Sequence, residues 1–274
     1  MSDDVVIVTM AEGGVAEVCL NRPERKNAWT LEMFDALAAA AEDLAARPGL
    51  RAVILRGAGG CFSSGLDLTV MQGFARDIEG LKREIVTPPQ GDAANRFQRP
   101  VVAWQRLPVP VIAAIEGVAY GAGFQLALAA DFRIAAPDAR VSVMEGKWGL
   151  IPDMGISQSL PRLIAADRAK ELIMTARVVA AEEALALGLL TRVVADPVAA
   201  ARAMAADLAQ RSPDALRAAK RLVEESWTLP PGGGLAVEAR LQAGIIGGAN
   251  QIEAVMAALA GRPPRFGPSG PGEP

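Results

Sequence analysis

Two carboxylates stand in a stretch of sequence that is otherwise glycine-rich and apolar. Glu145 and Asp153 belong to the segment VMEGKWGLIPDMG, residues 143–155, together with large apolar residues such as Trp148 and Ile151. Apolar surroundings disfavour the charged form of a carboxyl group, so its pKa rises toward the range useful for proton transfer. Most Asp and Glu side chains are simply solvated at the surface. We favour an acid–base site over that simpler interpretation.

Two glycine-containing turns are the other candidates for chemistry. CFSSGLDL, residues 61–68, and YGAGFQLALAA, residues 120–130, each follow a strongly apolar run and lead into a predicted helix. The first N–H groups of a helix have no intrahelical partner, so they can bind an oxygen on which negative charge develops. The backbone N–H groups of the loop around Ser64 and the N–H of Ala122 are therefore candidate donors. Each turn also has a structural interpretation: a tight turn at Gly65 in the first, close helix packing in the second. A dinucleotide fingerprint is a poor interpretation, because its third glycine is missing and the segment lies far from the N-terminal βαβ position expected for one.

The composition removes several alternatives. The chain has 274 residues, two cysteines, no histidine and a net charge of −3. Without histidine, a Ser-His-Asp triad, a Cys-His dyad and a His-ligated zinc site are impossible. Cys19 and Cys61 have no metal-like spacing, so we expect a reduced, cytoplasmic protein without a metal site. The slightly acidic charge balance argues against nucleic-acid binding.

Apolar runs and turn residues predict the elements that position these groups. The predicted strands are residues 5–10 and 15–20, which form a hairpin, then 51–57, 109–117, 131–136, 139–143 and 188–194. The predicted helices run from the N-cap Thr30 to about Ala46, from the YGAG turn to Ala130, and over 93–105, 156–165, 167–176 and 181–187. Residues 72–92, which contain TPPQG, are predicted to be irregular or mobile.

Beyond residue 195 the pattern is helical only. Asp196-Pro197 and Ser212-Pro213 each place proline at the first helical position after a capping residue, which predicts two helices, to about Gln210 and to Trp227.

We therefore predict three parts: an α/β core over residues 1–196, a helical region over 197–262, and a flexible tail over 263–274, which is rich in Pro and Gly. The N-terminus does not resemble a signal peptide. The apolar stretch 107–130 contains prolines, glycines and Glu116, so it predicts a strand, a turn and a helix rather than a membrane span.

The order of the motifs resembles one known family. NRPERKNAW, CFSSGLDL, PVIAAIEGVAYGAGFQLALAADFRIAA, EGKWGLIPDMG and LTRVV follow one another across residues 21–194. This arrangement resembles the crotonase, or enoyl-CoA hydratase/isomerase, superfamily over nearly the whole chain. The resemblance implies a spiral of ββα units, a helical C-terminal region that builds trimers or hexamers, and an acyl-CoA thioester as substrate. It implies no cofactor beyond the CoA of that substrate.

The same resemblance assigns roles to particular positions. The backbone N–H groups of Ser64 and Ala122 correspond to the two donors that hold the thioester oxygen as it becomes an enolate. Arg25 and Lys26 stand where the CoA nucleotide passes, although solvated loop charges are an alternative. The remaining positions expected at the substrate are Ser63, Gly65, Leu66, Asp67, Leu68 and Gly121.

The acids decide the predicted subtype. Hydratases of this family use two glutamates, and the matching positions here are Gln125 and Glu145. Gln125 can orient a water or the substrate by hydrogen bonds but cannot accept a proton. Members with a single glutamate are commonly double-bond isomerases. The dienoyl-CoA isomerases carry an aspartate at the position of Asp153 and a loop resembling FSSGLDL, although they have a third acid in place of Gln125. The aroyl-CoA dehalogenases also place an aspartate there, but with tryptophan in place of Glu145.

We therefore predict an enoyl-CoA hydratase or isomerase in which Glu145 is the acid–base group and Asp153 is either a second acid or a modulator of Glu145. A dienoyl-CoA isomerase that uses both acids is the first alternative. The second is an acyl-CoA-binding protein with little catalysis. We expect neither a nucleic-acid partner nor a membrane.

Overall fold

A six-stranded sheet runs through the centre of the computed structural model, which describes residues 4–269. In spatial order its strands are β1 (Val6–Met10), β2 (Val15–Leu20), β3 (Ala52–Gly57), β4 (Val111–Ile115), β6 (Phe132–Ala135) and β9 (Arg192–Val193). The predicted hairpin is confirmed, because β1 pairs antiparallel with β2. All other pairs in this sheet are parallel. The two ends of the chain, including the last five residues of the predicted tail, lie outside the described residues.

A second, smaller sheet brings the predicted motifs to one place. It consists of β5 (Val118–Tyr120), β7 (Arg140–Ser142) and β8 (Val179–Ala180). Ser63 pairs with Ala119 of β5 in an isolated bridge, so the loop after β3 runs beside the strand that leads into α5 (Ala122–Ala129). Strands β5 and β8 were not predicted, because each is too short to produce an alternating pattern.

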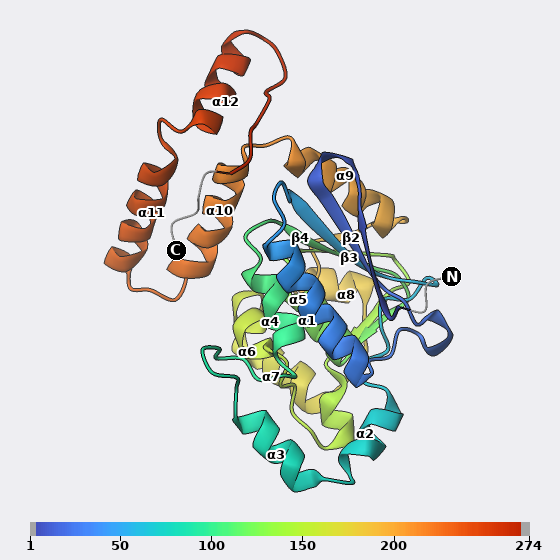
Figure 1. Ribbon diagram of the computed structural model, residues 1–274. Coiled ribbons are helices and arrows are strands. Elements are labelled where there is room, and N and C mark those ends of the chain that lie inside the picture. Colours follow the sequence, from blue (N-terminus) through green and yellow to red (C-terminus); the bar gives the residue numbers. More distant parts are fainter. Residues whose placement is uncertain (1–3, 270–274) are drawn as a thin grey trace.

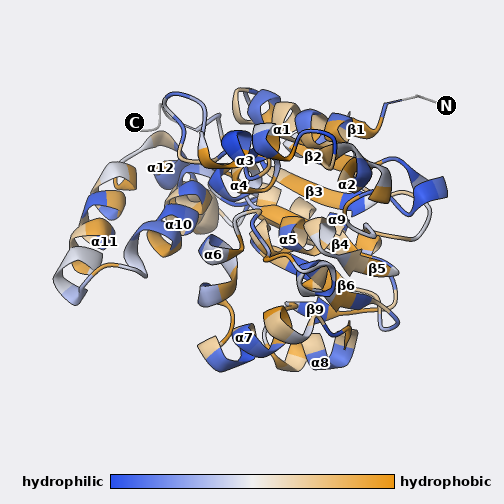
Figure 2. Ribbon diagram, turned by 90° about the horizontal axis from the view of Figure 1, so that it is seen from below, coloured by the Kyte–Doolittle hydropathy of each residue, from blue (hydrophilic) through white to orange (hydrophobic). Residues whose placement is uncertain are grey.

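Apolar helices cover the central sheet. α1 (Leu31–Ala45) begins at the predicted cap, where Thr30 Oγ1 accepts a hydrogen bond from the Met33 N–H at 3.3 Å. All eight residues of α5 are buried, as expected for a helix that is apolar on every side. Figure 2 shows the central strands in the hydrophobic colour. The other helices around the core are α4 (Arg99–Arg106), α6 (Ile156–Ser159), α7 (Ala166–Thr175), α8 (Ala181–Ala186) and α9 (Pro197–Ala209).

The prediction of an irregular segment over residues 72–92 is wrong for residues 72–74 and 78–86, whereas residues 87–92 are irregular. The structure contains two helices in this segment, α2 (Leu68–Phe74) and α3 (Ile78–Val86). Asp77 caps α3 by accepting a hydrogen bond from the Gly80 N–H at 2.8 Å. The residues that suggested disorder, from Pro88 to Gly91, follow α3 rather than interrupt it.

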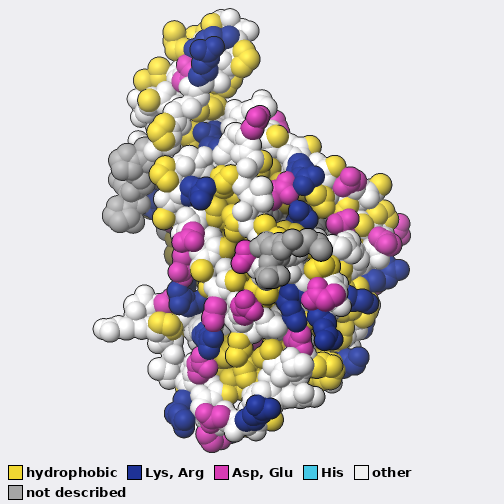
Figure 3. Space-filling view, turned by 45° about the vertical axis from the view of Figure 1, so that its right-hand side comes forward, with side chains coloured by type: hydrophobic (Ala, Val, Ile, Leu, Met, Phe, Trp, Pro, Cys, Tyr) yellow, Lys and Arg dark blue, Asp and Glu magenta, His cyan; other side chains and the backbone are white. Residues whose placement is uncertain are grey.

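Three helices form an arm that projects from the core: α10 (Pro213–Ser226), α11 (Pro231–Ile245) and α12 (Ala249–Leu259), at the upper left of Figure 1. The predicted cap of α10 is confirmed, since Ser212 Oγ accepts from the Ala215 N–H at 3.4 Å. Lys220 ties α10 to the core through an ion pair with Asp131 at 2.9 Å. Figure 3 shows hydrophobic side chains exposed on the arm, and Leu259 is 79% exposed.

The boundary between core and arm follows packing rather than the onset of helices. α9 falls in the helical region that we delimited by sequence, yet it packs on the central sheet through Ala201 and Ala205 against Ile54 and Ile112. Residues 263–269 lie along α12, where the Arg265 N–H donates to Glu253 at 2.6 Å. Within the described residues, no helix is both long and apolar enough to cross a membrane.

Candidate active site

A pocket of about 890 Å³ lies where the loop after β3, the start of α5 and the segment after β7 meet. Its wall contains both predicted acids, Glu145 and Asp153, together with Arg25 and Ala122. It also contains residues 64–68 of the CFSSGLDL loop and Gly121. The separate motifs of the sequence therefore border a single cavity. Lys26, Ser63 and Gln125 are not part of its wall.

Glu145 is a half-buried carboxylate with one buried, unpaired oxygen. It lies on a 3₁₀ helix, Met144–Trp148, that follows β7 directly. Its Oε1 accepts a hydrogen bond from Gln125 Nε2 at 2.7 Å, whereas its buried Oε2 has no hydrogen-bond partner among the residues that the structure describes. Burial raises the pKa of Glu145 above its ordinary value of 4.5, and the charge of Asp153 adds to this rise. A carboxylate whose pKa is raised is a stronger base than an ordinary one and is better suited to accept a proton.

Gln125 lies behind Glu145 rather than in the pocket. Its side chain is almost fully buried on α5. While Nε2 donates to Glu145, Oε1 accepts from the Met154 N–H at 2.9 Å. The Met154 N–H can only donate, so it fixes the orientation of the amide and turns the NH₂ group toward Glu145. Our expectation that Gln125 orients a water or the substrate does not match this geometry, because both ends of its amide are already engaged.

Asp153 is the second carboxylate of the pocket wall. Its side chain remains exposed, yet the protein around it displaces part of its solvent and raises its pKa above 3.8. Water still reaches Asp153 and screens its charge. The pocket thus presents two acids in unequal environments, Glu145 half-buried and Asp153 exposed.

The backbone donors differ in part from those predicted. The Ser64 N–H is not free, because it donates to the Lys26 carbonyl oxygen at 2.9 Å. The Gly65 N–H donates to Ser63 Oγ at 3.2 Å. Among the described residues, the N–H groups of Leu66 and Ala122 have no hydrogen-bond partner, and both residues border the pocket. The available pair is therefore Leu66 and Ala122, and the expectation of a free Ser64 amide is wrong.

Two glycines bring these donors close to Glu145. Gly65 has a φ of +92°, and a Cβ atom there would lie 2.8 Å from the Tyr120 carbonyl oxygen. Gly121, at a φ of +49°, precedes Ala122, and a Cβ atom on it would lie 3.3 Å from Glu145 Oε1. Any larger residue would be strained at both positions and would push the loop or the carboxylate away.

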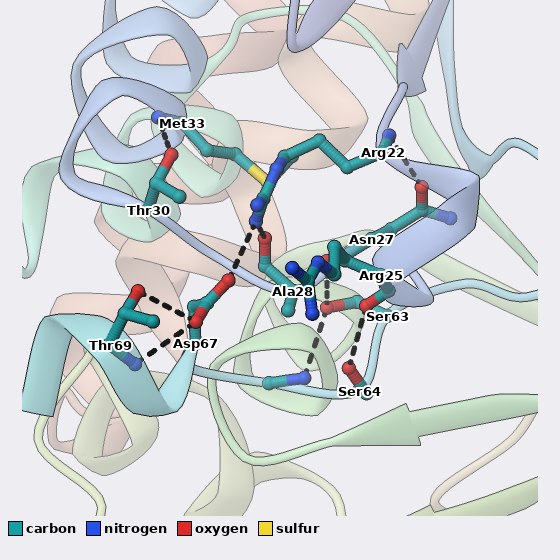
Figure 4. A network of polar contacts seen from close by, with 11 residues as sticks. Arg22, Arg25, Asn27, Ala28, Thr30, Met33, Ser63, Ser64, Asp67 and Thr69 are labelled. Atoms are coloured by element: carbon teal, nitrogen blue, oxygen red, sulfur yellow. Dashed lines mark hydrogen bonds and ion pairs between the residues drawn. The ribbon is translucent and has the colours of Figure 1, made fainter.

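The loop that carries Arg25 is held by a hydrogen-bond network, shown in Figure 4. Asn27 is fully buried; its Nδ2 donates to the Cys61 carbonyl oxygen at 2.6 Å, and its Oδ1 accepts from the Arg22 N–H at 2.8 Å. Ser63 Oγ donates to the Asn27 carbonyl oxygen at 2.8 Å. This network places Arg25 at the pocket, while the Lys26 side chain is exposed outside it. The role of Ser63 visible here is to join the two loops.

Asp67 and Leu68 form the transition from the loop into α2. Asp67 accepts from the Thr69 N–H at 3.0 Å and forms an ion pair with Arg22 at 3.1 Å. Hydrogen bonds from the N–H and the hydroxyl group of Thr69, and then the contact with Arg22, lower the pKa of Asp67, so this acid stays ionised and acts as a helix cap. Leu68 contributes an exposed apolar surface to the wall.

Sequence reasoning missed several parts of this site. It placed Leu66 at the substrate but did not identify its free N–H, and it did not include Lys147, which lines the wall. Asn27 gave no recognisable pattern, since its importance comes from contacts with residues distant in sequence. The hydrophobic periodicity of residues 78, 81 and 85 could have indicated α3.

Comparison with known proteins gives consistent matches. The family model described as Enoyl-CoA hydratase/isomerase matches residues 10–267. The mitochondrial methylglutaconyl-CoA hydratase of Mus musculus is 33% identical over 260 residues, which cover 92% of this chain and 79% of that protein. The mitochondrial Delta(3,5)-Delta(2,4)-dienoyl-CoA isomerase of Rattus norvegicus is 36% identical over 227 residues, covering 78% of this chain and 66% of that protein. The crystal structure of an enoyl-CoA hydratase from Bacillus anthracis superposes with a TM-score of 0.87 at 32% identity, covering 96% of this chain and 98% of that one.

Proposed function

Because the chain belongs to the enoyl-CoA hydratase/isomerase family, we propose that it moves a proton on an unsaturated acyl-CoA thioester through an enolate. One observation carries this proposal. A single pocket is lined by Glu145, whose buried Oε2 has no partner, and by Leu66 and Ala122, whose backbone N–H groups have none, among the residues that the structure describes. A base and two oxyanion donors are the groups that enolate formation requires.

The proposed sequence of events begins at the thioester carbonyl. Its oxygen accepts hydrogen bonds from the N–H groups of Leu66 and Ala122. The Glu145 carboxylate removes a proton from the acyl chain, and the electron pair of the broken C–H bond moves through the conjugated system to the carbonyl oxygen. Loss of one such donor typically lowers the rate by about a hundred- to a thousandfold. Return of the proton to a different carbon completes a double-bond shift.

The positions of the acids favour isomerisation over hydration. Hydration needs a second group in the pocket that holds the attacking water, and Gln125 is engaged elsewhere by Glu145 and Met154. Asp153 is available in the pocket as the second acid. We therefore propose a dienoyl-type shift in which one acid removes a proton and the other supplies one at a more distant carbon. The likeness to a dienoyl-CoA isomerase supports this choice.

Hydration is the second candidate, for one specific reason. Asp153 is exposed, so water can reach the same wall of the pocket as the substrate. Relatives named as hydratases agree with it. The substrate in the name methylglutaconyl-CoA hydratase has an acyl group that ends in a carboxylate, and under this second candidate the substrate of this chain would have one too.

Two further parts of the proposal concern binding. Arg25, held at the pocket by the Asn27 network, is proposed to bind a phosphate of CoA, with Lys26 on the same loop adding positive charge. The exposed apolar residues of α11 and α12, such as Leu235 and Leu259, are proposed to be covered by further copies of the chain in a trimer or hexamer.

The test is an ultraviolet assay of the purified chain on 2-enoyl-, 3-enoyl- and 3,5-dienoyl-CoA. We expect turnover of the dienoyl substrate, and a loss of about a hundred- to ten-thousandfold in Glu145→Ala. Asp153→Asn should affect the dienoyl reaction strongly and any 2-enoyl hydration weakly. Glu182→Gln, on the exposed face of α8, is the matched control and should retain full activity. Tight thioester binding without turnover would instead support an acyl-CoA-binding protein, and full activity in Glu145→Ala would exclude the assigned base.

A further inference from the structure

The pocket continues beyond the acids into an apolar region with two facing walls. One wall comes from α2 and α3, and the other from the segment 148–151 that follows Glu145. Large apolar side chains on both walls are exposed: Leu68 by 53%, Ile78 by 45%, Trp148 by 48%, Leu150 by 53% and Ile151 by 75%. Apolar surface that is contiguous with a catalytic pocket marks the place where an apolar part of the ligand is buried.

The inner end of this region is aromatic. Phe97 contacts Phe34 and Phe74 edge to face, with ring centroids 5.7 Å apart in both pairs. Leu81 and Ile85 of α3 complete the lining there. Within the described part of the chain, these walls contribute no charged side chain to the pocket.

The charged residues of the pocket lie outside α2, α3 and residues 148–151, although Lys147 Nζ stands 5.7 Å from the centroid of the Trp148 ring on one of these walls. These charged residues come from the loops before α1 and α2 and from the segment that holds the two acids: Arg25, Asp67, Glu145, Lys147 and Asp153. α3 separates the two kinds of residue sharply. Glu79 and Lys82 form an ion pair at 2.7 Å on the exposed face of this helix. Leu81 and Ile85 line the pocket. The amphipathic helix thus directs its apolar face toward the pocket.

From this distribution we infer that the site selects thioesters whose acyl group is apolar along its whole length and several carbons long, and that it rejects acyl groups ending in a carboxylate. The inference rests on the proposed function, because it places the thioester carbonyl beside Glu145. A terminal carboxylate would enter the region lined by Phe97, Leu81 and Ile85 and lose its hydration without gaining a partner. Burial of an unpaired charge is strongly unfavourable.

Calorimetric titration of the full chain with saturated acyl-CoA esters tests the inference, since these ligands have no double bond and report on binding alone. From butyryl- to hexanoyl- to octanoyl-CoA, the affinity should rise about fourfold per methylene (about 0.8 kcal/mol). Glutaryl-CoA should bind at least about tenfold more weakly than pentanoyl-CoA, which has the same number of acyl carbons. Affinities that do not change with chain length, or a glutaryl-CoA affinity equal to that of pentanoyl-CoA, would overturn the inference.

Substitutions on α3 locate the effect. Leu81→Arg puts a cation into the apolar end, so it should raise the affinity for glutaryl-CoA relative to pentanoyl-CoA. Lys82→Ala, on the exposed face of the same helix, should leave both affinities unchanged. Because the longer, charged side chain can also disturb α3, Leu81→Ala serves as a second variant. It should weaken octanoyl-CoA binding about tenfold, through lost apolar contact, and spare butyryl-CoA. Equal weakening of both ligands in Leu81→Ala would contradict the assignment.

The outcome is separable from that of the proposed function. A chain that shows the chain-length and carboxylate preferences but turns over none of the unsaturated esters would support the apolar acyl region and refute the proposed catalysis. A chain that turns over enoyl esters but binds glutaryl- and pentanoyl-CoA equally would do the reverse.

Discussion

Replacing Gln125 by methionine removes the single hydrogen bond that the Glu145 carboxylate receives from another side chain of the described residues. Gln125 Nε2 donates to Glu145 Oε1 at 2.7 Å, and Oε2 of the same carboxylate has no partner there. Methionine fills a similar volume, but it cannot donate. The substitution also leaves the Met154 N–H without its acceptor. We expect this loss to cost about 1–3 kcal/mol of folding stability.

The size of the effect on Glu145 follows from the charge on the acceptor. A hydrogen bond to a charged group contributes about 1.5–3 kcal/mol, and one pKa unit corresponds to about 1.36 kcal/mol. Removing the donor therefore raises the pKa of Glu145 by about one to two units. As a base, Glu145 must be deprotonated, so the acid limb of the kcat/KM profile should move to higher pH by the same amount.

Gln125→Glu is the matched control. Its carboxyl oxygen would stand about where Nε2 does, 2.7 Å from Glu145 Oε1. At such a separation, with an effective dielectric constant of about 20, two carboxylates repel by about 6 kcal/mol, or about four to five pKa units, so the pair keeps one proton through neutral pH. When that proton is on the introduced carboxyl group, the group can donate the hydrogen bond that Gln125 donates. We therefore expect the acid limb of the kcat/KM profile of Gln125→Glu to lie at a pH closer to that of the original chain than to that of Gln125→Met. An unchanged limb in Gln125→Met, or a larger displacement in Gln125→Glu, would refute the reasoning.

Three further outcomes follow from the site. Ala122→Pro deletes a backbone N–H at the first position of α5, where proline is tolerated, so activity should fall about a hundred- to a thousandfold while the far-ultraviolet circular dichroism spectrum stays the same; retained activity would exclude this amide as a donor. Asp153→Asn removes a charge that raises the pKa of Glu145, so the acid limb of kcat/KM should move to lower pH, and a shift in the other direction would show that Asp153 is not a repulsive neighbour. Glu145→Gln should stabilise the fold, relative to the original chain, more at pH 7 than at pH 4. The pKa of Glu145 in the folded state lies above 4.5, so ionisation of Glu145 opposes folding above that pKa and has no effect when the folded and unfolded states are both protonated. Thermal melts of the variant and the original chain at the two pH values measure this. An equal difference in stability between the two chains at both pH values would contradict it.

The sequence predicted the parts of the site that depend on local pattern. Glu145, Asp153 and Ala122 follow or adjoin short buried elements, and such elements end at a common edge of the fold. The prediction was less accurate where a distant partner decides the outcome. Whether the Ser64 amide is free depends on the Lys26 carbonyl, which no spacing between these residues indicates.

Gln125 and α3 illustrate the same limit. The sequence placed Gln125 correctly on a buried helix near Glu145, but the direction of its amide depends on the Met154 N–H, which only the folded chain brings close. For α3, proline and glycine in residues 88–91 outweighed the apolar spacing of the preceding turns. The proline and glycine residues affect only the end of the helix. Packing of Leu81 and Ile85 on the core stabilises the helix itself.

The joined loops around Asn27 have a consequence for how binding energy is used. Lys26 and Asn27 both adopt left-handed backbone conformations, with φ of +49° and +52°, and this shape is fixed by hydrogen bonds to the loop that ends at Leu66. The residue proposed to hold a phosphate and the amide proposed to hold the carbonyl oxygen therefore belong to one rigid unit. Contact made at the nucleotide end of a thioester would align its reacting end, so that remote contacts contribute to the rate of the chemical step as well as to affinity.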